Sequence, residues 1–173
     1  MKKILITYAT MAGSTKEVAE FIGNIVKSSD LEVDLLPVED VKSLAGYDAL
    51  ILGSAVRVFN LLPKTKWFLR KFRKAIRKIP LSAFLVCMVM NEDTPERSIT
   101  ATKFAKPIGK VKKPLSLGLF GGVMDPSKLT GYALGPFSNY PFEDKRDWEK
   151  IKNWANELVI LLKSHAEQRK EFL

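Results

Sequence analysis

Thr10, Gly13, Ser14 and Thr15 place three hydroxyl groups and one glycine within six residues near the start of the chain. Hydroxyl groups donate hydrogen bonds to an anion, and a glycine lets the backbone take a positive φ and approach a ligand closely. These residue types at this spacing favour the binding of a phosphate group. We assign the whole loop to the candidate site: Thr10, Met11, Ala12, Gly13, Ser14 and Thr15.

This loop lies between a predicted strand and a predicted helix. Residues 3–8 form the apolar run of a buried strand, and in residues 15–27 apolar side chains recur every three or four positions, as in a helix. The loop therefore stands at a helix N-terminus, where unpaired backbone N–H groups and the helix dipole attract an anion. Its position thus supports the same prediction as its residue types.

Other interpretations of the loop were weighed against a phosphate site. Ser14 and Glu17 match a capping box, in which two side chains satisfy the first N–H groups of the helix and no ligand is needed. That alternative does not account for three hydroxyl residues around a glycine directly after a buried strand. The glycine pattern of a dinucleotide site is absent, and Gly13 is not followed by the Gly-Lys-Ser/Thr of a nucleoside triphosphate loop. A single phosphate monoester remains the favoured ligand.

Length and composition limit what else the chain can contain. Its 173 residues are enough for one domain, spanning residues 1–173. With one cysteine and one histidine we assign no metal site, and we assign no catalytic side chain. Cys87 lies in an apolar run and is expected in the core. No signal peptide or spanning segment is evident, which predicts a cytoplasmic protein, with peripheral attachment to a membrane as the alternative.

Strand and helix patterns alternate along the chain, which predicts an α/β fold with a parallel five-stranded sheet. The strands that are almost continuously apolar belong in the middle of this sheet, whereas the two alternating strands belong at its edges. With right-handed crossovers this favours the order 2-1-3-4-5, in a three-layer sandwich with helices on both faces. The predicted strands are 3–8, 32–36, 49–54, 83–90 and 115–121, and the predicted helices are 15–27, 64–78, 95–105 and 146–165, with a shorter helix near Val41.

The predicted strand order also gives a place for the ligand. Its switch point lies between the first and third strands, and open α/β sheets bind ligands at the carboxyl ends of the strands there. Residues 54–62, which follow the third strand, should therefore face residues 9–15 across a crevice.

The loop pattern T-x-x-G-x-T, formed by Thr10, Gly13 and Thr15, resembles the phosphate loop of the flavodoxin family. Further segments resemble the branch of that family that includes the menaquinone-dependent protoporphyrinogen oxidases: ILGSAVR at 51–57, FGGVMDPSKL at 120–129 and Asp-Trp at 147–148. The resemblance implies a flavodoxin-like fold with FMN as the cofactor. A receiver domain shares this topology, but the chain lacks the acidic residues that a receiver needs after its first and third strands.

The same resemblance implies where the flavin ring would lie. Loops after the third and fourth strands would hold it, and two glycines after the fifth strand would let it approach the backbone closely. Arg57 could offset negative charge on the reduced flavin. These ring candidates are Ser54, Ala55, Val56, Arg57, Phe59, Met90, Asn91, Gly121 and Gly122.

Charge separates this chain from the acidic electron carriers of that family. Its formal net charge is +9, and residues 49–91 contain nine cations without a single Asp or Glu. Such a field attracts an acidic redox protein or an anionic membrane, whereas nucleic acid is disfavoured because no recognised binding motif accompanies the charge. Four of these cations form the outer face of the predicted helix 64–78 and are called the basic stripe below: Arg70, Arg73, Lys74 and Arg77.

Together these features predict an FMN-binding redox protein that passes electrons to a protein or to a small-molecule acceptor. One alternative is a flavoenzyme of the protoporphyrinogen oxidase type, although residues 124–144 are less basic than that type implies. A second alternative is a flavin-free binding module that docks through the basic stripe. Residues 124–144 also bring four aromatic side chains to the expected mouth of the crevice: Tyr132, Phe137, Tyr140 and Phe142.

Overall fold

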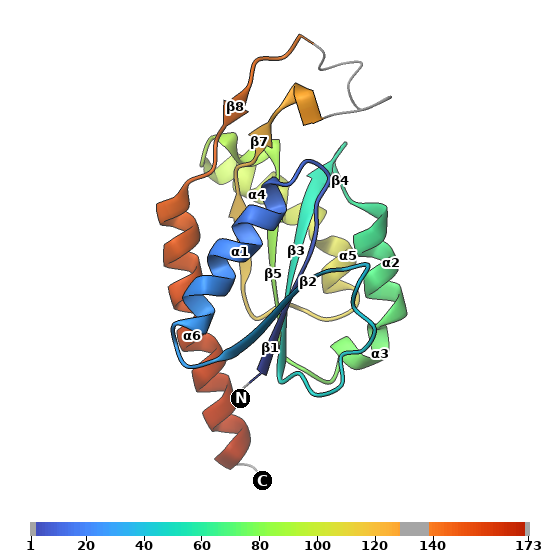
Figure 1. Ribbon diagram of the computed structural model, residues 1–173, viewed down its shortest axis with the longest axis vertical. Helices are drawn as coiled ribbons and strands as arrows, with labels where there is room; N and C mark the ends of the chain where they lie inside the picture. Colours follow the sequence, from blue (N-terminus) through green and yellow to red (C-terminus); the bar gives the residue numbers. More distant parts are fainter. Residues whose placement is uncertain (1–2, 129–138, 172–173) are drawn as a thin grey trace.

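The computed structural model describes residues 3–128 and 139–171, and it has the predicted α/β architecture (Figure 1). Five parallel strands form the main sheet in the order β2-β1-β3-β5-β6, and the short β4 pairs antiparallel with the end of β3. Counting the five parallel strands alone, this is the predicted order 2-1-3-4-5, which is confirmed. The strands are β1 (Lys3–Ala9), β2 (Glu32–Pro37), β3 (Ala49–Arg57), β4 (Asn60–Leu61), β5 (Leu81–Val86) and β6 (Leu117–Phe120).

Helices cover both faces of this sheet, so the fold has three layers (Figure 1). One layer holds α1 (Ser14–Lys27) and α6 (Trp148–Glu171). The other holds α2 (Pro63–Lys71), α3 (Arg73–Ile76), α4 (Pro95–Phe104) and α5 (Lys106–Gly109). No helix in the described ranges is long and apolar enough to cross a membrane.

Alternating side chains of the central strands build a separate core on each face. Ile4 and Ile6 of β1 belong to a cluster with α1 and α6, whereas Leu5 belongs to a cluster with α2, α3 and α5. Because both faces are packed, β1, β3 and β5 are apolar almost throughout. The edge positions predicted for the two alternating strands are confirmed, since β2 and β6 end the sheet.

Several predicted boundaries were wrong. The fourth parallel strand, β5, ends at Val86 rather than near Met90, and a 3-10 turn, η1 (Met88–Asn91), follows it. This turn is packed against α4, so its apolar residues look like a continuation of the strand in the sequence. The predicted helix 64–78 is interrupted at Phe72, whose φ of −100° and ψ of 13° separate α2 from α3.

No helix forms near Val41. Residues 38–40 form a turn and residues 41–44 are irregular, although Val38 and Val41 are both buried. The backbone N–H of Val38 instead donates to the carbonyl of Tyr8, which prolongs the ladder beyond β2. Short elements were also missed: α5, β4, the 3-10 turn η2 (Pro126–Lys128), and the antiparallel pair β7 (Val123–Met124) and β8 (Glu143–Asp144).

Candidate functional site

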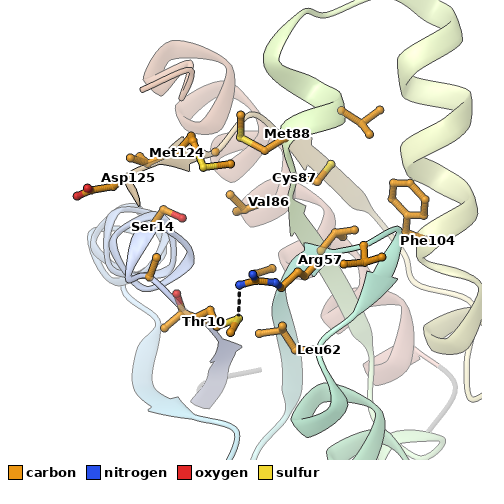
Figure 2. A pocket seen from close by; sticks show the side chains of 18 of the residues that line it. Thr10, Ser14, Arg57, Leu62, Val86, Cys87, Met88, Phe104, Met124 and Asp125 are labelled. Atoms are coloured by element: carbon orange, nitrogen blue, oxygen red, sulfur yellow. Dashed lines mark hydrogen bonds between the residues drawn. The ribbon is translucent and has the colours of Figure 1, made fainter. Parts of the chain in front are cut away.

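A cleft of about 440 Å³ opens at the carboxyl ends of β1, β3 and β5. This is the predicted switch point, and the loops after β1 and β3 face each other across it (Figure 2). Most of the lining side chains are apolar, with hydroxyl groups gathered where α1 begins. The lining residues are Thr10, Met11, Ala12, Ser14, Ala55, Val56, Arg57, Val58, Phe59, Leu62, Val86, Cys87, Met88, Val89, Phe104, Gly122, Val123, Met124, Asp125 and Tyr140.

The loop after β1 is shaped by its own hydroxyl group and glycine. The backbone N–H of Gly13 donates to Thr10 Oγ1 at 3.0 Å, and Gly13 itself has φ of 96°, a left-handed conformation that favours glycine. Helix α1 then begins at Ser14 without any side chain capping it. The capping box considered for Ser14 and Glu17 is therefore absent, and the first N–H groups of α1 are left for water or a ligand.

Glu17 has a different partner, Arg146, at the start of α6. The Arg146 guanidinium contacts both Glu17 and Asp144, and its centre lies 4.7 Å from the ring of Trp148. Hydrogen bonds from Arg146 lower the pKa of the Asp144 carboxyl below its ordinary value. Arg146 thereby fastens the segment after β8 to the first turn of α1, beside the cleft.

Thr15 is the deepest residue of the loop. It is fully buried, and in the described part of the chain its Oγ1 has no hydrogen-bond partner. A buried polar group without a partner costs about 1–3 kcal/mol. Thr7 in β1 and Ser82 in β5 carry orphaned hydroxyl groups too, but only Thr15 belongs to the uncapped first turn of a helix. The residues present therefore fit an anion.

The end of β3 turns back as a hairpin instead of entering a loop. Arg57 pairs with Asn60 across this hairpin, which leaves Val58 and Phe59 as a two-residue turn with φ values of 45° and 58°. We call these two residues the hairpin tip. Turns of this geometry favour Asn and Gly, and a left-handed conformation costs other residues about 1–2 kcal/mol each.

Four of the five ring candidates from this segment line the cleft: Ala55, Val56, Arg57 and Phe59. Ser54 does not, because its side chain turns into the protein and its Oγ lies 2.8 Å from Thr65 Oγ1 of α2. This buried pair ties the end of β3 to the first turn of α2. Two residues of the candidate loop after β1, Gly13 and Thr15, likewise do not line the cleft.

Arg57 spans the cleft from the hairpin to the loop after β1. Its Nη1 donates to Met11 Sδ at 3.0 Å, the contact drawn as a dashed line in Figure 2. Among the cleft residues that the structure describes, Arg57 and Asp125 are the two charged ones. Arg57 thus provides the positive charge inside an otherwise mainly apolar site.

On the β5 side, the structure brings other residues to the cleft than those predicted. Because β5 ends at Val86, residues 86–89 line the cleft, while Met90 is buried against Ala101 behind it. Asn91 and Gly121 face a separate cavity of about 100 Å³. A Cβ at Gly121 would lie 2.2 Å from the carbonyl oxygen of Lys145, so this glycine accommodates the backbone before α6 and Gly122 alone of the pair lines the cleft.

Phe104 escaped sequence reasoning because it comes from a distant segment, whereas Tyr140 is one of the four aromatic residues predicted at the mouth of the crevice, and it lines the cleft. Phe104 ends α4 and its ring lies 6.0 Å from that of Phe59. Tyr140 comes from the long connection before α6, whereas Tyr132 and Phe137 lie outside the described residues. Burial raises the pKa of the Cys87 thiol to about 11, which keeps it protonated near neutral pH.

Comparison with known proteins gives matches along almost the whole chain. The flavodoxin domain family matches residues 5–133. Protoporphyrinogen IX dehydrogenase [quinone] of Escherichia coli K12 is 22% identical over 186 residues, covering 92% of this chain and 96% of that protein.

Solved structures give the same result at the level of the fold. A flavodoxin from the domain Archaea superposes with a TM-score of 0.60 and 20% identity, covering 93% of this chain and 99% of its own. A Fusobacterium nucleatum flavodoxin bound to flavin mononucleotide gives a TM-score of 0.58 and 18% identity, covering 91% of this chain and 97% of its own.

Proposed function

The chain belongs to the flavodoxin domain family, and on that premise we propose that it binds FMN in the cleft and transfers electrons through the flavin. The resemblance inferred from the sequence is thus confirmed at the level of the family. The flavin supplies one- and two-electron chemistry when it is bound, and no side chain is required as an acid or base.

One observation carries this proposal: the start of α1 lies at one end of a mainly apolar cleft, and within the described residues its first turn has no side-chain cap and contains the buried, unpartnered hydroxyl group of Thr15. A phosphate would take hydrogen bonds from the first turn of α1 and from Thr10, Ser14 and Thr15. The rest of the cleft lining, residues 55–59 and 86–89, is mainly apolar. It suits a flat aromatic ring and restricts the access of water to that ring.

A titration with FMN tests the proposal. We expect the protein to bind FMN and turn yellow, and Thr15→Val to weaken binding about 10- to 100-fold, because a hydrogen bond to a charged group contributes about 1.5–3 kcal/mol. The same substitution should stabilise the FMN-free protein, since it removes an orphaned hydroxyl group from the interior. Binding is followed by the quenching of flavin fluorescence, and stability by thermal unfolding.

Thr7→Val is the matched control for this titration. Thr7 is also fully buried, and its Oγ1 has no partner in the described part of the chain, but it lies in β1 rather than in the first turn of α1. It should stabilise the protein and leave the affinity for FMN unchanged. Equal affinities for all three proteins would remove Thr15 from the phosphate site. A protein that binds no FMN at all would favour the flavin-free docking module.

Arg57 gives a second prediction, on the reduction potential. A guanidinium in the cleft stabilises the anionic reduced flavin, so Arg57→Glu should lower the midpoint potential by roughly 50 mV or more. Arg57→Gln, which removes the charge without reversing it, should give a smaller shift in the same direction. Potentiometric titration of the FMN-bound proteins measures both, and an unchanged potential in Arg57→Glu would place Arg57 outside the electrostatic reach of the ring.

A flavoenzyme acting directly on a small substrate is the second candidate function. It is supported by the full-length similarity to the E. coli protoporphyrinogen IX dehydrogenase [quinone]. Anaerobic turnover of protoporphyrinogen with a quinone separates this candidate from an electron carrier, because a carrier would show none.

As an electron-transfer protein the chain needs a redox partner, and the basic stripe is the surface we propose for meeting it. Arg70, Arg73, Lys74 and Arg77 are all exposed along α2 and α3, although Arg77 Nε also donates to the carbonyl of Val111 at 3.2 Å. An acidic redox protein and an anionic membrane would both be drawn to this charge.

A further inference from the structure

The hairpin tip is strained and exposed at the same time. Val58 and Phe59 both have left-handed backbone conformations, yet 78% of Val58 and 70% of Phe59 remain accessible to solvent. Asn and Gly would form this turn without strain. Both residues line the cleft, and the ring of Phe59 lies 6.0 Å from that of Phe104, but most of each side chain remains accessible, so an external apolar phase would stabilise them further.

Helix α2 continues this surface from the base of the hairpin. Lys66 Nζ donates to Asn60 Oδ1 at 3.0 Å, which fixes the hairpin against the helix. The next residue, Trp67, is 47% exposed, and Lys71 Nζ lies 4.6 Å from the centre of its ring. An exposed tryptophan next to a lysine is typical of side chains at a lipid–water interface.

The charge around these apolar residues is positive and unpaired. Arg70, Arg73 and Lys74 are exposed, and within the described ranges none of them forms an ion pair. Lys64, at the start of α2, does pair with Glu39. The tip and the outer faces of α2 and α3 therefore combine apolar side chains with free cations.

We propose that the hairpin tip and the outer faces of α2 and α3 dock the protein on an anionic lipid membrane. Lipid headgroups neutralise the free cations, and the apolar layer beneath them takes up Val58, Phe59 and the ring of Trp67. An acidic protein matches the charges equally well, but its hydrophilic surface gives no reason for a strained apolar tip. The combination of both features favours the membrane.

Docking in this way places the mouth of the cleft at the membrane, because Val58 and Phe59 also line the cleft. The electron acceptor would then be a molecule dissolved in the lipid. This last step rests on the proposed function, whereas the docking itself does not.

Flotation of the protein with lipid vesicles, in the presence and in the absence of FMN, tests the docking. We expect binding to phosphatidylcholine vesicles containing ~30% phosphatidylglycerol, little binding to pure phosphatidylcholine, and weaker binding as NaCl rises from about 50 to about 500 mM. Bound protein should show a blue shift of tryptophan emission that Trp67→Phe abolishes.

Two variants separate the apolar and ionic contributions. Val58→Asn with Phe59→Gly installs the favoured turn residues, so the fold is retained or stabilised, while vesicle binding should fall at least about 10-fold. Arg70→Glu with Lys74→Glu should also abolish the preference for anionic lipid. The matched control is Ile160→Ser, which removes an equally exposed apolar residue from α6 in the opposite layer and should bind as the wild type does.

Several results would overturn the proposal. The first is wild-type protein that does not bind vesicles at low salt. The second is a tip variant that binds vesicles as well as Ile160→Ser does. The third is protein that does not bind vesicles but binds an acidic ferredoxin through the basic stripe. The FMN titration is independent of these outcomes. Normal FMN binding without flotation rejects the docking alone, and flotation without FMN binding rejects the redox function alone.

Discussion

Ser14→Asp is expected to reduce the affinity for FMN by about 100-fold or more while leaving the FMN-free protein at least as stable as the wild type. Ser14 is the first residue of α1 and lines the cleft. A carboxylate there interacts favourably with the helix dipole, which is worth about 0.3–1 kcal/mol. The same carboxylate repels a phosphate that binds to that helix end. Stability and affinity should therefore change in opposite directions, which general misfolding could not produce.

Ser98→Asp is the matched control for this experiment. Ser98 lies in the early part of α4 and outside the cleft lining, so it introduces the same group near another helix N-terminus. Its affinity for FMN, measured by flavin fluorescence, should equal that of the wild type. If Ser14→Asp bound FMN normally, the phosphate could not lie at the start of α1, and the assignment of the loop would fail.

Reversal of the basic stripe is expected to have the second large effect. Replacing Arg70, Arg73, Lys74 and Arg77 by Glu nearly cancels the formal net charge of +9, because each replacement removes two units of charge. Electrostatic steering changes association rates by about 10- to 1000-fold. We therefore expect reoxidation of the reduced protein by the anion ferricyanide to slow about 10-fold or more at low salt. Stopped-flow absorbance of the flavin measures this rate.

A redox probe of opposite charge provides the internal control. Oxidation by the cation hexaammineruthenium(III) should become faster in the reversed protein, and both differences should shrink as salt is added. Two double variants then test whether position matters. Arg70→Glu with Lys74→Glu reverses charge on the basic stripe, whereas Lys27→Glu with Lys163→Glu reverses the same amount of charge on exposed residues of the α1 and α6 layer. Equal rates in this pair would mean that the position of the stripe has no effect.

The strand order and the position of the loop after β1 could be predicted because local patterns specify them. The hydroxyl residues of the loop, Gly13 and the helical repeat after it are contiguous in sequence. The edge strands could be recognised because their residues alternate in polarity, whereas the central strands do not.

The capping box that Ser14 and Glu17 match in the sequence does not form, and the cause lies far away in the sequence. Ser14 and Glu17 have the right spacing, but Glu17 interacts with Arg146, which lies 129 positions further along the chain. Met90 and Asn91 failed to reach the cleft for a related reason. A buried 3-10 turn and a buried strand have the same apolar composition, so the end of β5 at Val86 depends on where β6 and α4 pack.

Phe104 had no sequence signal that linked it to the cleft, and it becomes a lining residue only through the tertiary packing of the end of α4. Tyr140 could be predicted at the mouth because it lies in the long aromatic connection before α6. Ser54 is the opposite case. Its position at the end of β3 suggested a contact with the ligand, but its side chain forms a hydrogen bond with Thr65 instead and does not line the cleft. Residues near a site could thus be located by strand order, but the direction of each side chain could not.

The contact of Arg146 with Glu17 has a consequence for the folding kinetics of the chain. Joining two residues so far apart requires closure of a very long loop, and such contacts form after the local strands and helices have assembled. We therefore expect Arg146→Ala to accelerate unfolding while leaving the refolding rate nearly unchanged. The segment beside the first turn of α1 would then be among the last parts of the protein to become ordered, and a newly made chain would complete its sheet before it could retain a flavin.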